Sequence, residues 1–152
     1  MKRATLAITL ALLSAPALHA QASLSQCRTS SAAEMLVLFD QWNAGLLSGD
    51  PAQVAQLYSK DAVLLPTLSP VPRLTHVDRL AYFEKFLRDG PSGKLDTHEV
   101  QTGCNEATAA GLYTFEFAAT GQKVAARYTF TYRWDGQRWL ISQHHSSLQP
   151  QG

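Results

Sequence analysis

The sequence predicts an α+β fold in which helices come first and a mainly antiparallel sheet follows. Apolar residues recur at helical spacing in the first half of the chain and alternate at strand spacing from about residue 95 onward. The last two alternating segments meet at Asp135-Gly136, a dipeptide that accepts the positive φ values of a tight hairpin turn. Helices followed by a series of strands are typical of the α+β class.

Residues 1–22 have the features of a secretory signal peptide. A short positive region precedes an apolar stretch at 4–13 that is too short to span a bilayer, and the small-x-small site Ala20-Gln21-Ala22 follows. We expect cleavage after the second alanine or, less ideally, after the first; a retained N-terminal anchor is the alternative. The remaining chain, 23–152, suits a single domain. The protein is therefore expected to be exported, to the periplasm or the medium.

Charge argues against polyanionic partners. The chain has 13 basic and 12 acidic residues, and loss of Lys2 and Arg3 with the leader leaves 11 against 12. No basic run occurs, so the positive surface that phosphate recognition requires is missing. We expect neither nucleic acid nor a membrane surface as a partner.

Two cysteines remain after cleavage, Cys27 and Cys104. An even count in an exported protein favours a disulfide between them, which would be structural. Two independent thiols are the alternative, and neither cysteine has the sequence neighbourhood of a known nucleophile.

The first helix is predicted over residues 32–47. Its apolar stripe consists of Met35, Leu36, Leu38, Phe39, Trp42 and Leu46. The serines before it suit a helix cap, and Gly49 ends it. Asp50 and Pro51 then predict the N-cap and first turn of a second short helix, which runs to about Tyr58.

A short buried strand is predicted over 61–66, since its apolar run ends at a proline. A proline-rich loop follows over 66–74. Thr75 and Asp78 resemble a capping box, with Asp in place of Glu, and so predict the start of a third helix. The apolar residues on one side of this helix are Leu80, Phe83, Phe86 and Leu87. The loop 90–93 ends it.

The second half of the chain predicts four strands, over about 95–103, 108–119, 122–134 and 138–148. Turn residues such as Thr120-Gly121 and Asp135-Gly136 separate them. No internal repeat or low-complexity tract is present.

Several of these segments are similar to a known family, and the similarity extends over nearly the whole of 23–152. The segments 47–50, 57–64 and 82–87, with the terminal hairpin, resemble the nuclear transport factor 2-like superfamily, which includes SnoaL-like proteins. The segments 111–115, 126–130 and 144–147 resemble bacterial secreted relatives of the association domain of calcium/calmodulin-dependent protein kinase II. The kinase domain and the calmodulin-binding segment of the animal enzyme are absent, so no kinase activity is expected.

This resemblance implies a cone-shaped fold, with helices closed over a curved sheet, and a homo-oligomer, a dimer or a larger ring, with a cavity in each subunit. In the related ketosteroid isomerases the proton-shuttling aspartate stands before a proline, at the position of Leu65 here, and a leucine cannot transfer a proton. The enolate-stabilising tyrosine of those enzymes corresponds to a position near Trp42, whose indole only donates a hydrogen bond. Ketosteroid isomerase chemistry is therefore not expected.

The resemblance also makes Arg127 a candidate ligand residue. Arg127 shares strand parity with Thr129 and Arg133, opposite the aromatic positions Tyr128 and Phe130. If this polar face is directed into the cavity, Arg127 is placed to bind a carboxylate in bidentate fashion. We favour this arrangement; a surface or interface position is the alternative.

His144 and His145 cannot both serve one site, because adjacent strand residues point to opposite faces. No third ligand at suitable spacing accompanies them, so no metal site is expected. His145 shares the parity of Trp139 and Ile141, and it is the candidate for proton relay or anion binding. A histidine hydrogen-bonded at a subunit interface is an equally good interpretation.

Further pocket candidates are Trp42, Tyr58, Tyr82 and Tyr113, although aromatic residues at such positions usually belong to a core. No Gly-x-Ser-x-Gly elbow and no Gly-x-Gly-x-x-Gly fingerprint occurs, so neither nucleophilic hydrolysis nor a cofactor is expected.

Three functions fit the sequence. We favour an exported oligomer whose cavity binds a small anionic or amphipathic molecule. The second is an acid-base enzyme of the SnoaL-like or isomerase type, with His145 as base and Arg127 stabilising an oxyanion. The third is an oligomerisation module that binds no ligand.

Overall fold

The structure, a computed structural model, describes residues 27–150, so the predicted signal peptide lies outside it. The elements are α1 (Ala32–Ser48), α2 (Pro51–Ala55), β1 (Tyr58–Leu65), α3 (His76–Phe86), a 3-10 turn (Leu87–Asp89), β2 (Pro91–Thr102), β3 (Glu106–Phe117), β4 (Gln122–Trp134) and β5 (Trp139–Leu148). The predicted α+β fold is confirmed.

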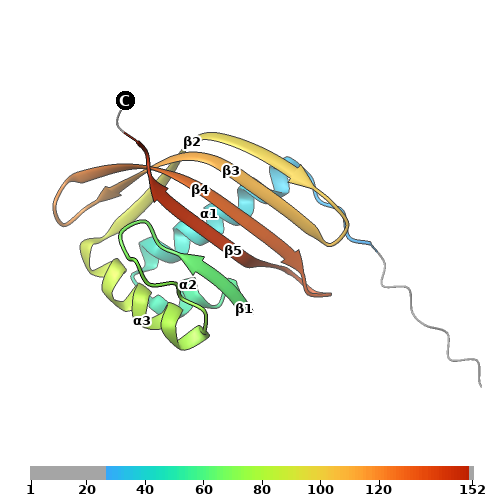
Figure 1. The fold of residues 1–152 in the computed structure, drawn as a ribbon, viewed down its shortest axis with the longest axis horizontal. Helices are drawn as coiled ribbons and strands as arrows, with labels where there is room; N and C mark the ends of the chain where they lie inside the picture. The colour runs from blue at the N-terminus through green and yellow to red at the C-terminus, as the bar shows by residue number, and fades with distance from the viewer. Residues whose placement is uncertain (1–26, 151–152) are drawn as a thin grey trace, which may run out of the picture.

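A single curved sheet in the order β1-β5-β4-β3-β2 forms the body of the molecule. The ladders from β2 to β5 are antiparallel, whereas β1 pairs with β5 in parallel at the sheet edge. The helices lie against one face, and together the two layers form a cone (Figure 1). The other face of the sheet is open in the single chain.

Side-chain caps fix the three helix starts that the sequence predicts. The Ser31 hydroxyl accepts from Glu34 N–H, and the Asp50 carboxylate accepts from Ala52 N–H. At α3 the capping box is complete, because Thr75 and Asp78 each accept from the other's backbone N–H. Such caps satisfy amide groups that have no partner within the helix.

Two predicted connections, before β1 and before β2, have wrong boundaries. Tyr58 does not end the second helix but begins β1, because α2 stops at Ala55 and Leu57 N–H closes the turn on the Val54 carbonyl. The predicted loop 90–93 shrinks to Gly90, since Pro91 already opens β2 as its first residue, a position that needs no ladder donor.

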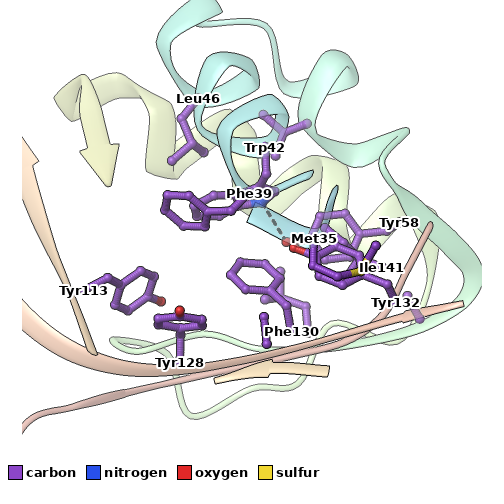
Figure 2. Packing of buried hydrophobic residues seen from close by; sticks show 14 of the residues in the cluster. Met35, Phe39, Trp42, Leu46, Tyr58, Tyr113, Tyr128, Phe130, Tyr132 and Ile141 are labelled. Atoms are coloured by element: carbon purple, nitrogen blue, oxygen red, sulfur yellow. Dashed lines mark hydrogen bonds between the residues drawn. The ribbon is translucent and has the colours of Figure 1, made fainter. Parts of the chain in front are cut away.

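The core lies between the helices and the sheet and is largely aromatic. The aromatic side of β4, with Tyr128 and Phe130, packs against Phe39 and Trp42 of α1 (Figure 2). The Trp42 and Phe130 rings meet edge to face with centroids 5.3 Å apart, a favourable arrangement for aromatic pairs. The face of β4 toward the helices is therefore the aromatic one.

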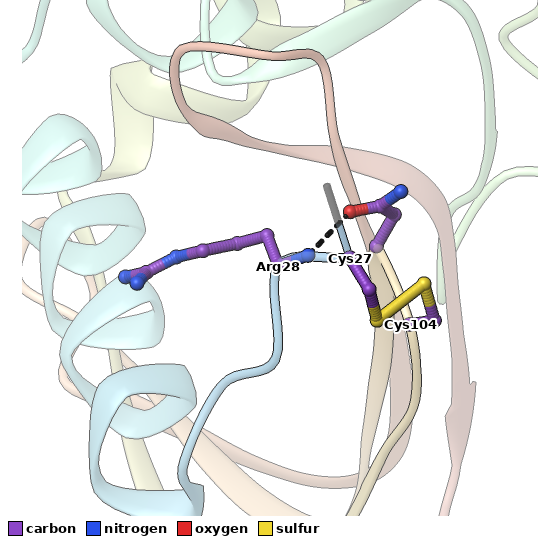
Figure 3. The surroundings of a disulfide bond; sticks show 4 residues. Cys27, Arg28 and Cys104 are labelled. Carbon is purple, nitrogen blue, oxygen red and sulfur yellow. Dashed lines mark hydrogen bonds between the residues drawn. A yellow bond between two sulfur atoms is a disulfide. The ribbon is translucent and has the colours of Figure 1, made fainter. Parts of the chain in front are cut away.

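The predicted disulfide joins Cys27 to Cys104, with Cα atoms 5.1 Å apart (Figure 3). Beside it, Arg28 N–H donates to the side-chain oxygen of Asn105 at 2.8 Å. The bond ties the segment before α1 to the β2–β3 turn. Within residues 27–150, no helix has both the length and the apolar character needed to cross a bilayer.

Strands β2 and β3 approach each other closely at a bulge. The register shifts between Leu95 and Thr97, and a Cβ placed on Gly111 would lie 2.1 Å from the Thr97 carbonyl oxygen. Only glycine fits there without movement of the backbone.

Candidate functional site

A cavity of about 310 Å³ opens between α3, the loop 66–75 and the inner face of the sheet. Its walls are mostly apolar: Leu64, Phe83, Phe86, Phe115, Phe117 and Val124. Its polar side chains come from separate elements: Thr67, Arg73, Tyr82, Tyr113, His144 and Ser146. A mainly apolar pocket with a few convergent polar groups is the usual form of a small-molecule site.

A chain of hydrogen bonds fixes the imidazole of His144. The Trp42 indole N–H donates to the Tyr58 hydroxyl at 3.0 Å (Figure 2), and that hydroxyl lies 2.8 Å from His144 Nδ1. The ring also stacks on Phe130, with centroids 3.9 Å apart. His144 is therefore held by β1, α1 and β4 together.

The direction of this chain assigns the histidine tautomer. An indole nitrogen only donates, so the Tyr58 oxygen accepts from Trp42 and its own O–H is free to donate to His144 Nδ1. The ring proton then resides on Nε2, which is buried and has no protein partner. Burial, with a smaller contribution from the charge of His145, lowers the pKa of His144 to about 3. At neutral pH the wall of the cavity thus includes a neutral imidazole whose Nε2–H makes no hydrogen bond within the described residues.

Three hydroxyls meet on the wall of the same cavity. The Tyr113 hydroxyl donates to Ser146 Oγ, and Ser146 Oγ also bonds to Thr67 Oγ1. Burial raises the pKa of the Tyr113 phenol, so it remains a protonated donor. These hydroxyls and the imidazole come from β3, β5 and the loop after β1, elements that only the fold brings together.

Arg73 supplies a cation on the loop that borders the cavity. Its backbone exchanges two hydrogen bonds with Leu64, and its guanidinium donates to Ser69 Oγ at 3.0 Å and lies 5.6 Å from the Tyr82 ring centroid. Arg73 Nε is buried and unpartnered, like His144 Nε2. Lys85 and Asp89 also line this part of the cavity and balance each other in charge. The site therefore carries one fixed positive charge in excess.

The prediction that Arg127 and His145 face this cavity is wrong. Both line a shallow depression on the opposite, outer face of the sheet, with Leu112, Thr129 and Ser147. For Arg127 the reason is burial: the aromatic residues of β4 occupy the inner face, so the polar residues point outward.

For His145 the reason is a bulge. Thr131 is opposite Gln143 but the next residue of β4, Tyr132, is opposite Ile141, so Ser142 is an extra residue in β5. An extra residue reverses the alternation of side chains beyond it. Ile141 and Ser142 are both buried, and after them His144 and Ser146 point inward while His145 points outward. The alternation of side chains counted from Trp139 therefore holds only up to the bulge at Ser142.

The other predicted site residues lie on the inner side. Trp42, Tyr82 and Tyr113 line the cavity, and Tyr58 stands behind His144 as its hydrogen-bond partner. Leu65 is absent from the cavity wall and 39% of the residue is exposed, while Leu64 lines the cavity. Within the part of the chain that the structure covers, no three His, Cys, Asp or Glu residues are grouped as metal ligands.

Sequence reasoning missed His144, Ser146, Thr67 and Arg73. A bulge has no composition signal in this strand, so the sequence did not reveal the inward direction of His144 and Ser146. Thr67 and Arg73 lie in a proline-rich loop without periodicity, where only the fold assigns a direction to a side chain.

Comparison with known proteins finds one matching family and several similar structures. A family model described as calcium/calmodulin dependent protein kinase II association domain matches residues 31–150. A crystal structure from Xanthomonas campestris that bears the same family name is 42% identical, with a TM-score of 0.77, and the match covers 81% of this chain and 91% of that one. No curated protein sequence gives a significant match.

Two more distant structures share the fold. A cyanobacterial iota-carbonic anhydrase complexed with bicarbonate has a TM-score of 0.70 at 19% identity, covering 82% of this chain and 95% of that one. A nuclear transport factor 2-like protein from Streptomyces avermitilis has a TM-score of 0.71 at 10% identity, covering 78% and 96%. At these identities the similarity is one of fold.

Proposed function

This chain belongs to the calcium/calmodulin dependent protein kinase II association domain family, and on that premise we propose that its cavity binds bicarbonate and interconverts it with carbon dioxide. The observation that carries the proposal is that two buried donors without partners belong to residues that line one cavity. His144 Nε2 and Arg73 Nε make no hydrogen bond to any described residue, and the hydrogen-bonded hydroxyl residues Tyr113, Ser146 and Thr67 line the same cavity. A buried donor without a partner lowers the stability of the fold, because it has lost its hydrogen bond to water. An anionic ligand that accepts a hydrogen bond from the donor would recover this free energy on binding.

Bicarbonate matches this set of donors. It is a small planar anion whose three oxygens accept hydrogen bonds, and the guanidinium of Arg73 supplies the opposite charge. The apolar part of the cavity, around Phe86 and Phe117, suits carbon dioxide, which has no charge and little need for hydrogen bonds. The cyanobacterial enzyme, of the same fold, was crystallised with bicarbonate and supports this choice of ligand.

The proposed reaction uses a water molecule from the cavity. Its oxygen adds to the carbon of carbon dioxide, a new C–O bond forms, one C=O π bond opens onto oxygen and one proton leaves the water. His144 Nε2–H and Arg73 stabilise the oxygen that gains charge. The proton passes along the hydroxyls of Tyr113, Ser146 and Thr67 to buffer, so that bicarbonate and one proton balance carbon dioxide and water.

The adjacent histidines provide a matched test. Stopped-flow measurement of carbon dioxide hydration with a pH indicator is expected to show catalysis by the protein and a loss on the order of 100-fold in His144→Leu, which removes one oxyanion donor. His145→Leu, a neighbour on the outer face, is the control and should retain the rate. A wild-type rate equal to that of buffer, or equal losses in both variants, would reject the proposal.

We also propose that the chain is exported and acts as a homo-oligomer. Export is supported by the leader-like residues 1–22 and by the Cys27–Cys104 disulfide, which persists in oxidising compartments. Mass spectrometry of the protein secreted by a bacterial host should give an N-terminus at Ser23 or Gln21. Analytical ultracentrifugation should give a mass of at least two chains, and a monomer at micromolar concentration would contradict self-association.

A further inference from the structure

Arg79 is a fully buried arginine with no carboxylate partner. It lies on α3 and none of its side chain is exposed. The two acids whose charges act on Arg79 are engaged elsewhere: Asp61 pairs with Arg133 at 3.3 Å, and Asp78 caps α3 at Thr75. Taking a cation out of water costs several kcal/mol, and without an ion pair little of that is recovered through charge pairing. A stabilising role alone gives a weak reason for this residue.

The guanidinium instead binds the backbone of β1. Nη1 donates to the Ala62 carbonyl at 2.6 Å, and Nη2 donates to the carbonyls of Ser59 at 2.9 Å and Lys60 at 3.2 Å. These carbonyls lie where the β1–β5 ladder is interrupted. Tyr58 is opposite Ile141 and the next paired residue of β1 is Val63, opposite Gln143, so the residues of β1 between them have no partner in the ladder. Arg79 thus replaces the missing ladder partners of the segment that begins at Tyr58.

The same cation acts on the Tyr58 ring, whose centroid lies 5.8 Å from it. The Tyr58 ring is also packed against Phe83, one turn after Arg79 on α3. Arg79 therefore fixes the start of β1 and the ring of Tyr58, and with them the place of the Tyr58 hydroxyl.

We propose that Arg79 is the positioning residue of the cavity: it holds Tyr58 as the donor to His144 Nδ1 and so keeps the proton of His144 on Nε2, the donor that the proposed function assigns to the anion. The assignment of that anion as bicarbonate rests on the proposed function. The contacts from Arg79 to Tyr58 and from Tyr58 to His144 do not depend on which anion is bound.

The test is the tautomer of His144, read by long-range ¹H–¹⁵N correlation in the folded protein. The wild type should show the proton on Nε2. Arg79→Met, which keeps the length of the stem but removes the charge, should give a mixture of the two tautomers and bind ¹³C-bicarbonate at least about tenfold more weakly. Arg133→Met, the loss of an exposed arginine that contacts the same strand at Asp61, should change neither.

A purely structural role would lower the thermal midpoint of Arg79→Met and leave the tautomer unchanged, which would overturn the proposal. If Arg79→Met does not fold, Arg79→Lys decides, because lysine keeps the charge and should keep the Nε2 proton. A folded lysine variant with mixed tautomers would refute the role. Absence of bicarbonate binding in the wild type would count against the proposed function alone, since the tautomer is measured without ligand.

Discussion

The hydroxyl of Tyr58 lies 2.8 Å from Nδ1 of His144, although 86 residues separate them in sequence. The two residues stand on β1 and β5, the parallel pair at the edge of the sheet. The first helix adds the third member, Trp42, so the cavity histidine depends on the correct docking of α1 and of β1 on the sheet.

Tyr58→Phe should destabilise the protein by about 1–3 kcal/mol, because it leaves Trp42 Nε1 and His144 Nδ1 buried without partners. Urea unfolding measures this loss. Tyr128→Phe is the control: its hydroxyl makes one partly buried bond, to the Thr97 carbonyl at 3.2 Å, and the loss should be about 1 kcal/mol or less. Equal losses would show that the Tyr58 network adds no stability.

Stability should fall as the pH is lowered from about 6.5 toward 3, because only the unfolded chain can then protonate His144. Above the ordinary pKa of 6.5 the ring is neutral in the folded and the unfolded state, so it adds nothing to the pH dependence of the free energy of unfolding. With a folded-state pKa of about 3, the loss between about pH 7.5 and about pH 5 is roughly 2 kcal/mol, measured by urea unfolding at both values.

His144→Gln should remove this dependence and His145→Gln should keep it. Hydrogen bonds lower the pKa of three aspartates, Asp61, Asp78 and Asp135, below 3.8, so their stabilisation is lost only at still lower pH. A loss of the same size in His144→Gln would assign the dependence to another group.

Reduction of the disulfide should destabilise the fold by roughly 4 kcal/mol, since the bond closes a loop with a sequence separation of 77 residues. Thermal unfolding with and without dithiothreitol tests this, with the double variant Cys27→Ser, Cys104→Ser as the unreactive reference. The cavity is lined by other residues, so the bicarbonate binding proposed for it should persist while the reduced protein stays folded. An unchanged midpoint would contradict the prediction.

Gly111→Ala should cost more than about 2 kcal/mol, because the new methyl group would lie 2.1 Å from the Thr97 carbonyl oxygen and the bulge would have to move. Gly103→Ala is the matched control, since the nearest atom to its Cβ is the Glu106 carbonyl oxygen at 3.6 Å. It should change the free energy of unfolding by less than about 0.5 kcal/mol. Chemical denaturation compares the two, and similar losses would contradict the close approach.

The sequence predicted the elements that have local signals. The caps at Asp50 and Thr75 set helix starts by short-range hydrogen bonds. The hairpin turn forms at Asp135-Gly136, where the glycine has φ 104° and the Asp135 carboxylate accepts from the next two backbone N–H groups after the glycine. The 122–134 strand was predicted to the residue, because its alternation is uninterrupted and turns flank it. Local chemistry decides such features before tertiary contacts form.

The site was less predictable because long-range contacts place it. Ser142 reverses the parity of β5, so counting from Trp139 selected His145 and missed His144. Arg79 did have a signal: it precedes Phe83 by one turn, on the buried side of α3. A charged residue within an apolar stripe is where a buried functional group should be sought.

The histidine and serine doublets at 144–147 give the last strand an unusual tolerance. A slip of one residue exchanges the two faces of a strand and normally destroys a binding wall. Here the slip would put His145 and Ser147 where His144 and Ser146 now stand, and the cavity would again present a histidine with a serine two residues later. Each face of the last strand thus carries one histidine and one serine, two residues apart. The extra residue at Ser142 determines which of the two pairs faces the cavity.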